Sequence, residues 1–267
     1  MRSFDNAYFN IGHLDMLSYR QTFVHRLDPV VKLLVTLAFI LFVVSFPKYE
    51  IGMLLPFFLF PVFIMSAGDI PVGVITRKLL VVSPFVLFVG IFNPVLDREV
   101  ICIVFGVTVS GGWVSYASIV IKFILTISSA LLLIATTSFP GICFALERLR
   151  VPRIFVVQLL FLYRYIFVLI EETMRIARAR NMRTFGRRGR GVRTFINITG
   201  VLLVRSIERS ERIYQAICSR GFDGQIRMLK EHRFGFADSI FTFVSIAAFA
   251  ALRKYNIAEM IGGMFLF

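Results

Sequence analysis

Long apolar stretches joined by short polar connections dominate the first half of the chain. Residues 30–46, 51–67, 78–96 and 115–139 are almost wholly apolar. About 20 such residues cross the hydrocarbon core of a bilayer as a helix. The pattern therefore predicts four membrane spans before residue 140. A shorter apolar run at 238–252 predicts a fifth span near the end of the chain.

Local signals mark several boundaries of these predicted spans. Asp28 is a good N-cap, and Pro29 suits the first position of a helix. Pro56 and Pro61 lie inside the second run, so we expect that helix to be kinked. Asn93-Pro94 marks the end of the third span. Residues 100–114 are rich in Gly and β-branched side chains, which predicts an extracytoplasmic loop or a small hairpin.

The centre of the chain has a different character. Residues 140–150 read as a short amphipathic helix, and a long helix over 153–182 begins apolar and ends charged. A second long helix is predicted over 194–220. Its apolar residues recur every three or four positions and charged residues occupy the remainder, so it is amphipathic. Since one charge at the bilayer centre costs roughly 2.5–3.5 kcal/mol, this helix is not expected to span the membrane.

Composition supports an all-α integral membrane protein. The chain is 57% hydrophobic, contains 30 Phe, and has a formal net charge of +14. The basic excess gathers between residues 140 and 236, which the positive-inside rule places in the cytoplasm. We therefore expect three parts: a lead-in with four transmembrane helices (1–139), a cytoplasmic domain (140–235), and a transmembrane helix with a tail (236–267). Five spans put the N-terminus inside and the C-terminus outside.

The sequence offers little sign of catalytic or metal chemistry. Three cysteines and three histidines are scattered without the spacing of metal or redox sites. We therefore expect no catalytic, metal or cofactor site in this chain. The basic turn at 186–191 (GRRGRG) lacks the ending of a P-loop, and contact with anionic lipid headgroups explains it better than nucleic acid does.

Two arginines lie just before possible helix ends. Glu171 precedes Arg180 by the same distance as Glu211 precedes Arg220. The residues that follow, Asn181 and Gly221, are of the types that accept the left-handed conformation at a helix C-terminus. A cation there is favoured by the helix dipole. The pattern alone favours two ordinary helix ends that carry basic residues over a pair of binding arginines.

Four stretches resemble a known family. They are HRLDPVVKLL at 25–34, Asn93-Pro94, LRVP at 149–152 leading to YRYIFVLIEE at 163–172, and the segment from Arg205 to Gly224 that ends SRGFDG. Together these are similar to the transmembrane T component (EcfT family) of energy-coupling factor ABC transporters, closest to the CbiQ-type permeases of cobalt and nickel uptake. The chain departs from the family at Val30, where a basic residue is more frequent.

The resemblance implies two cytoplasmic coupling helices, each ending in an Ala-Arg-Gly-like triplet that contacts an ATPase. Ser219-Arg220-Gly221 matches the second triplet, and Ala179-Arg180-Asn181 is the match for the first. We expect the coupling helices to be supported by charged residues on their polar faces: Glu171, Glu172, Glu208, Glu211 and Arg212, with an ion pair between Glu208 and Arg212.

The resemblance also implies the partners and the location. They are two ABC-type ATPase subunits, which hold the ATP and Mg, and a substrate-binding membrane subunit of the CbiM or NikM type. It allows for a small accessory membrane subunit, and it includes no nucleic acid. The expected location is the cytoplasmic (inner) membrane of a bacterium or archaeon, with the lipid bilayer around the chain.

The expected function is that of a non-catalytic component that couples ATPase movement to uptake of cobalt or nickel ions. Two alternatives remain. One is a T component for vitamin uptake. The other, from a different class, is a membrane-anchored scaffold whose basic domain binds lipid or nucleic acid.

Overall fold

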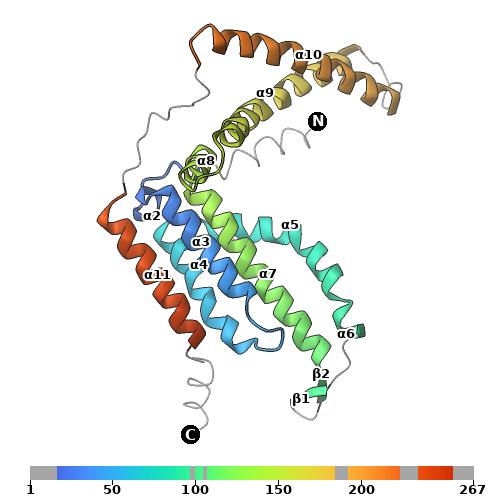
Figure 1. Ribbon diagram of the computed structural model, residues 1–267. Helices are drawn as coiled ribbons and strands as arrows, with labels where there is room; N and C mark the ends of the chain where they lie inside the picture. Colours follow the sequence, from blue (N-terminus) through green and yellow to red (C-terminus); the bar gives the residue numbers. More distant parts are fainter. Residues whose placement is uncertain (1–16, 97–99, 105–106, 184–191, 223–233, 255–267) are drawn as a thin grey trace. The chain divides into compact units, whose positions relative to one another are not determined.

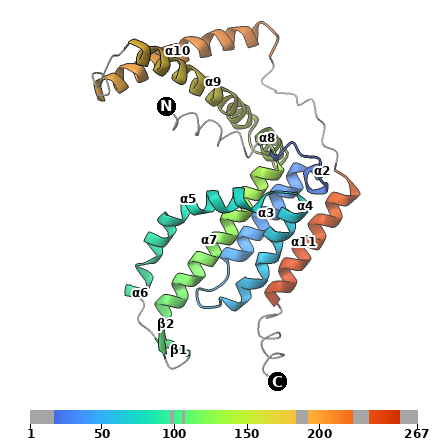
Figure 2. The same ribbon diagram turned by 180° about the vertical axis from the view of Figure 1, so that it is seen from behind.

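The computed structural model describes residues 17–96, 100–104, 107–183, 192–222 and 234–254, and this part of the chain is helical apart from one hairpin. It forms two compact units with a boundary inside α8, between Ile142 and Cys143. One unit contains α2 to α7 and α11, and the other contains α9 and α10. In the first unit α3, α4, α7 and α11 lie side by side in both views (Figures 1 and 2).

The first unit contains consecutive elements of the chain and, after the second unit, one more helix, α11. They are α2 (Phe23–Arg26), α3 (Pro29–Val44), the 3₁₀ helix η1 (Gly52–Phe58), α4 (Leu59–Ala67), α5 (Val72–Gly90), α6 (Asn93–Leu96), β1 (Val100–Val104), β2 (Val107–Ser110), α7 (Gly111–Thr136) and α11 (Phe236–Lys254). The boundary helix is α8 (Phe139–Arg148), and the second unit contains α9 (Arg153–Arg183) and α10 (Val192–Cys218).

The predicted start of the first apolar helix is confirmed. Pro29 is the first residue of α3, and one carboxylate oxygen of Asp28 accepts the backbone N–H of Val30 at 2.8 Å. This bond satisfies one of the donors that the first turn of a helix leaves unpaired.

The second apolar run folds as two segments instead of one kinked helix. Pro56 lies inside η1, whose tighter turns replace the α-helical hydrogen bonds that a proline would interrupt. The α-helix α4 begins only at Leu59. Pro61 then lies in its first turn, where a missing N–H breaks no helical bond.

The third helix begins earlier than its apolar run. α5 starts at Val72, directly after the extended residue Pro71, so Arg77 lies inside the helix instead of before it. It ends at Gly90, and Asn93-Pro94 belongs to the separate short helix α6. The predicted span over 78–96 is therefore wrong at both ends, because the charge boundary does not coincide with the backbone signal of Pro71.

The loop that follows contains the small hairpin that its composition suggested. β1 and β2 pair in antiparallel fashion, with Val104 opposite Val107. The next helix, α7, begins at Gly111, four residues before the predicted start at 115.

Aromatic rings form the core of the first unit. The Phe39 ring of α3 lies 4.6 Å from that of Phe60 and 5.3 Å from that of Phe249, measured between centroids. Phe60 and Phe249 meet edge to face at 5.1 Å. Such pairs add about 0.5–1.5 kcal/mol each beyond the burial of area. α11 is thus packed onto helices that lie some 200 residues earlier in the chain.

The described residues include four helices that are long and apolar enough to cross a membrane, by length and composition: Val72–Gly90, Gly111–Thr136, Arg153–Ala179 and Phe236–Lys254. α3 and the segment Gly52–Ala67 are apolar but shorter. The third candidate is most of α9, which the sequence pattern assigned to the cytoplasmic domain. Its first half is therefore suited to contact with lipid.

Candidate functional site

The end of α10 presents the second predicted triplet. Gly221 has a φ of +73°, in the left-handed region that favours glycine. Its N–H donates to the carbonyl of Cys218 at 3.0 Å, and the N–H of Phe222 donates to the carbonyl of Ile217 at 3.3 Å. These two bonds form a Schellman motif, so the predicted left-handed conformation at Gly221 is confirmed.

Arg220 occupies the C-cap position of this motif. Its side chain is exposed, and it forms no ion pair with any residue that the structure describes. The C-terminal carbonyls of a helix carry partial negative charge, which favours a cation at this position. The geometry therefore holds a guanidinium group at the tip of α10, available to a partner.

The first predicted triplet does not end a helix. α9 continues through Ala179, Arg180 and Asn181 as far as Arg183, so the prediction that Asn181 closes the helix is wrong. The physical reason is that asparagine tolerates the left-handed conformation but can also remain in a helix. Glycine has a lower helix propensity than asparagine, so it ends a helix more readily. Arg180 still falls within the last turn of α9.

Charged pairs connect α9 and α10 and line their surfaces. Glu172 of α9 accepts a hydrogen bond from Arg205 of α10 at 2.6 Å, with the Glu172 side chain 22% exposed. The predicted pair between Glu208 and Arg212 is present at 4.0 Å. Both partners of that pair are exposed, so it contributes little to stability. The Glu172–Arg205 pair joins the two helices.

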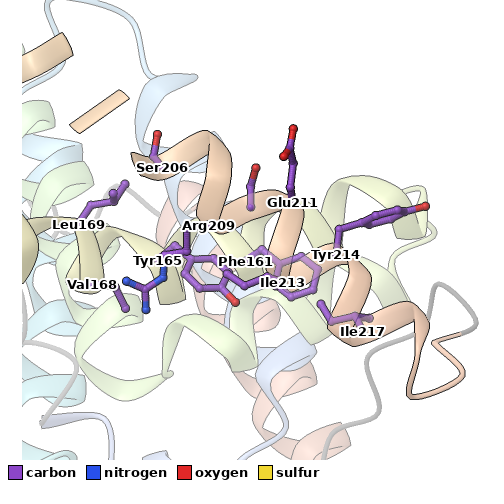
Figure 3. A pocket seen from close by; sticks show the side chains of 11 residues that line it. Phe161, Tyr165, Val168, Leu169, Ser206, Arg209, Glu211, Ile213, Tyr214 and Ile217 are labelled. Carbon is purple, nitrogen blue, oxygen red and sulfur yellow. The ribbon is translucent and has the colours of Figure 1, made fainter. Parts of the chain in front are cut away.

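A groove of about 540 Å³ lies between α9 and α10. Figure 3 shows its lining, with Phe161, Tyr165, Val168 and Leu169 from α9 and Ile213, Tyr214 and Ile217 from α10. Four polar or charged residues of α10 also line the groove: Ser206, Arg209, Ser210 and Glu211. The two helices run in opposite directions along the groove, because Leu169 and Ser206 lie near one end and Phe161 and Ile217 near the other.

The sequence reasoning missed this groove and the place of Arg209 in it. The sequence pattern puts the charged residues of α10 on its polar face, yet one of them, Arg209, lines the groove. A signal was available in α9, where aromatic residues recur at i,i+4. The rings of Phe161 and Tyr165 stack at 6.1 Å between centroids, and those of Tyr163 and Phe167 meet at 5.2 Å. Which helix would face them could not be read from that spacing.

Two other expectations concern this part of the chain. The whole of the basic turn, residues 186–191, lies outside the described residues, which exclude 184–191. Among the residues that are described, no cluster of three or more His, Cys, Asp or Glu is arranged to hold a metal ion.

A polytopic bundle of apolar helices with a pair of long charged helices defines a helical membrane protein. Comparison with known families then identifies it further. The model of the CbiQ cobalt transport protein family matches residues 20–231, so the chain belongs to this family. The family likeness found in the sequence is thereby confirmed, and the chain is a transmembrane component of a transport system.

Individual relatives agree with this assignment. The energy-coupling factor transporter transmembrane protein EcfT of Ruminiclostridium cellulolyticum is 25% identical over 240 residues, which cover 84% of this chain and 89% of the relative. The cobalt transport protein CbiQ of Salmonella typhimurium is 25% identical over 154 residues, covering 53% and 68%. A putative fused cobalt transport protein, CbiMQ, of Methanocorpusculum labreanum is 31% identical over 97 residues, covering 36% of this chain and 16% of that protein.

Proposed function

We propose that this chain is the energy-coupling transmembrane component of an ATP-driven transporter that takes up cobalt or nickel ions. The observation that carries the proposal is the exposed Arg220 in the Schellman motif at the end of α10. An arginine makes bidentate, charge-assisted hydrogen bonds with carboxylates. Arg220 docks in an acidic groove on one ABC-type ATPase subunit, and Arg180, near the end of α9, docks on a second one.

In this mechanism the chain itself neither hydrolyses ATP nor holds the metal. ATP and Mg are bound by the ATPases, whose relative movement is transmitted through α9 and α10. The Glu172–Arg205 pair makes the two helices respond together. A substrate-binding membrane subunit covers the apolar side chains that α10 exposes, among them Leu203, Val204 and Ile207. The domain carrying α9 and α10 lies on the cytoplasmic side of the membrane.

The choice of cobalt rests on the family's description and on the names of the relatives from Salmonella and Methanocorpusculum, and nickel rests on the resemblance found in the sequence. The alternative is a T component for vitamin uptake. It is favoured by the general name of the Ruminiclostridium relative, which specifies no metal. Uptake of labelled cobalt, nickel and vitamins by cells that express the complete transporter separates the two. Uptake of vitamins alone would overturn the metal assignment.

The coupling role is tested with Arg220→Gln and Arg220→Glu in the complete complex. We expect both variants to insert normally, and co-purified ATPase and substrate uptake to fall by at least tenfold for Arg220→Glu. The matched control is Arg77→Gln, which neutralises an exposed arginine of α5. Recovery of the full ATPase complement with Arg220→Glu would overturn the proposed contact.

A further inference from the structure

The groove between α9 and α10 continues into a second, polar depression. This depression has a volume of about 280 Å³ and is lined by Leu169, Glu172, Leu202, Arg205, Ser206, Glu208, Arg209 and Arg212. Three of these residues, Leu169, Ser206 and Arg209, also line the groove. The two hollows are therefore adjacent parts of one surface. Its groove side carries the apolar residues Phe161, Val168 and Ile213 (Figure 3), and its other side carries the charged residues of the depression.

The charges of the depression leave one arginine uncompensated. Arg205 is paired with Glu172 at 2.6 Å, and Arg212 lies 4.0 Å from Glu208. Among the described residues Arg209 pairs with no carboxylate, so three arginines face two glutamates here. Glu211 lines the neighbouring groove, but Figure 3 shows its carboxylate pointing away from the rings of Phe161 and Tyr165. The junction of groove and depression therefore attracts an anion.

We propose that this surface binds one anionic phospholipid. Its acyl chain lies in the groove, and its phosphate contacts Arg209, with Arg205 and Arg212 beside it. Arginine matches the geometry of a phosphate group, and basic pockets beside membrane helices attract anionic headgroups. The site is within reach of the bilayer when the domain lies at the cytoplasmic face of the membrane, as in the proposed function, because the first half of α9 is apolar.

The chemistry of the lining favours a lipid over a peptide segment. The surface exposed in the groove is mostly apolar, and five lining residues offer no side-chain hydrogen-bond partner: Phe161, Val168, Leu169, Ile213 and Ile217. A peptide backbone buried there would leave polar groups unpaired, which is costly, whereas an acyl chain has none to satisfy. The lipid is a ligand of this chain and is additional to the subunits of the proposed transporter.

The test uses the full chain purified in mild detergent, titrated in native mass spectrometry with phosphatidylglycerol and with phosphatidylcholine of the same acyl chains. We expect phosphatidylglycerol to bind about fivefold more tightly, the effect of one basic residue near a headgroup. Arg209→Gln should abolish this preference. Arg178→Gln, which neutralises an exposed arginine of α9 outside both hollows, should retain it. Equal binding of the two lipids by the unaltered chain overturns the proposal.

A second set of variants tests the groove. Ile213→Trp and Val168→Phe fill the groove. Both should weaken the binding of the two lipids equally, while the helical content measured by circular dichroism stays unchanged. Unchanged lipid binding in both variants would place the acyl chain elsewhere and overturn the proposal. Inorganic phosphate added as a competitor should not displace phosphatidylglycerol, and displacement would instead define a free-anion site.

A photocrosslinking residue at position 214 identifies the occupant in native membranes. Tyr214 lines the groove and is 69% exposed, so a reactive group there reaches whatever fills the space. A lipid adduct supports the proposal. A crosslink to a protein subunit in place of lipid would show that the groove is a subunit interface and would overturn it.

Discussion

Lys32 and Lys122 each donate a hydrogen bond near the C-terminal end of the other's helix. Lys32, in the first turn of α3, donates to the carbonyl of Thr136, the last residue of α7, at 2.8 Å. Lys122 of α7 donates to the carbonyl of Phe46, just beyond the end of α3, at 2.5 Å. The two antiparallel apolar helices are thus joined at both ends of α3 by a lysine that donates to a backbone carbonyl, and in the case of Thr136 this is a carbonyl that the end of the helix leaves unpaired.

Replacing either lysine with methionine should lower the free energy of unfolding. Lys32→Met and Lys122→Met each leave a carbonyl without its charged donor, at a cost of about 1–3 kcal/mol. The measurement is denaturant unfolding of the purified chain in mild detergent. Lys254→Met, at an exposed position at the end of α11, is the control and should change stability by less than about 0.5 kcal/mol. Wild-type stability in both core variants would contradict the capping role.

The Asp238 carboxylate connects the starts of two helices. One oxygen accepts the N–H of Asp28 at 2.9 Å, and the other accepts the N–H of Gly235 at 2.8 Å. In Asp238→Asn an amide group replaces one acceptor and faces an N–H donor, so we expect a loss of about 1.5–3 kcal/mol in the same unfolding measurement. Ser239→Ala, one residue along and exposed, should be neutral. Equal stability of the two variants would rule out a structural role for the bridge.

Two glycines of α5 should respond in opposite ways to replacement by alanine. A Cβ at Gly90 would lie 2.7 Å from the ring of Tyr116, whereas one at Gly73 would have no neighbour within 4 Å. Gly90→Ala should cost about 1–3 kcal/mol through overpacking, and Gly73→Ala should be neutral or slightly stabilising. Thermal unfolding distinguishes them. If the contact is responsible, Tyr116→Ala should remove most of the difference, and additive effects would argue against it.

Gly221, just after α10, and Gly200, within it, form a second pair of test and control positions. Gly221→Ala places a Cβ in the left-handed region, at a cost of about 1–2 kcal/mol, and weakens the motif that holds Arg220. Gly200→Ala lies within α10 in open space and should strengthen the helix. Hydrogen exchange of the Phe222 amide reports on the motif. It should become faster in Gly221→Ala only, and unchanged exchange would mean that the motif does not depend on glycine.

Stability should also depend on the protonation of His25, which precedes the first apolar helix. Burial, together with the charge of Lys32, lowers the pKa of this imidazole. Its Nδ1 lies 2.7 Å from the Thr22 hydroxyl, and its Nε2 has no hydrogen-bond partner among the described residues. The unfolded chain therefore takes up a proton near pH 6.5 that the folded chain resists.

Acidification should consequently destabilise the fold. The free energy of unfolding should fall as the pH drops below about 6.5, and the fall should level off below the lowered pKa of the folded state. His25→Gln cannot be protonated, so this part of the pH dependence should disappear in unfolding curves recorded between pH 5 and 8. An identical slope in the variant would assign the effect to other groups.

Local chemistry made much of the chain predictable. The Asp28 cap, Pro29 at the first helical position, the hairpin after α6 and the left-handed Gly221 each depend on a few adjacent residues. The apolar runs and the charged helix pattern were sufficient for an all-α membrane protein. Two predictions of helix boundaries that were wrong also depended on a few adjacent residues. Asn181 can either end or continue a helix, and the charges at 77 and 78 do not determine where α5 begins.

The sequence by itself thus determined the class of the protein, most helix positions and the motif that holds Arg220, because short-range hydrogen bonding and hydrophobic periodicity act between neighbours. Only the tertiary structure decided which distant groups meet. Asp28 and Asp238 are separated by 210 positions, and the pairs formed by Lys32 and Lys122 depend on α3 lying against α7. The groove of α9 and α10 likewise exists only where two helix faces come together, since no single helix contains a concave surface.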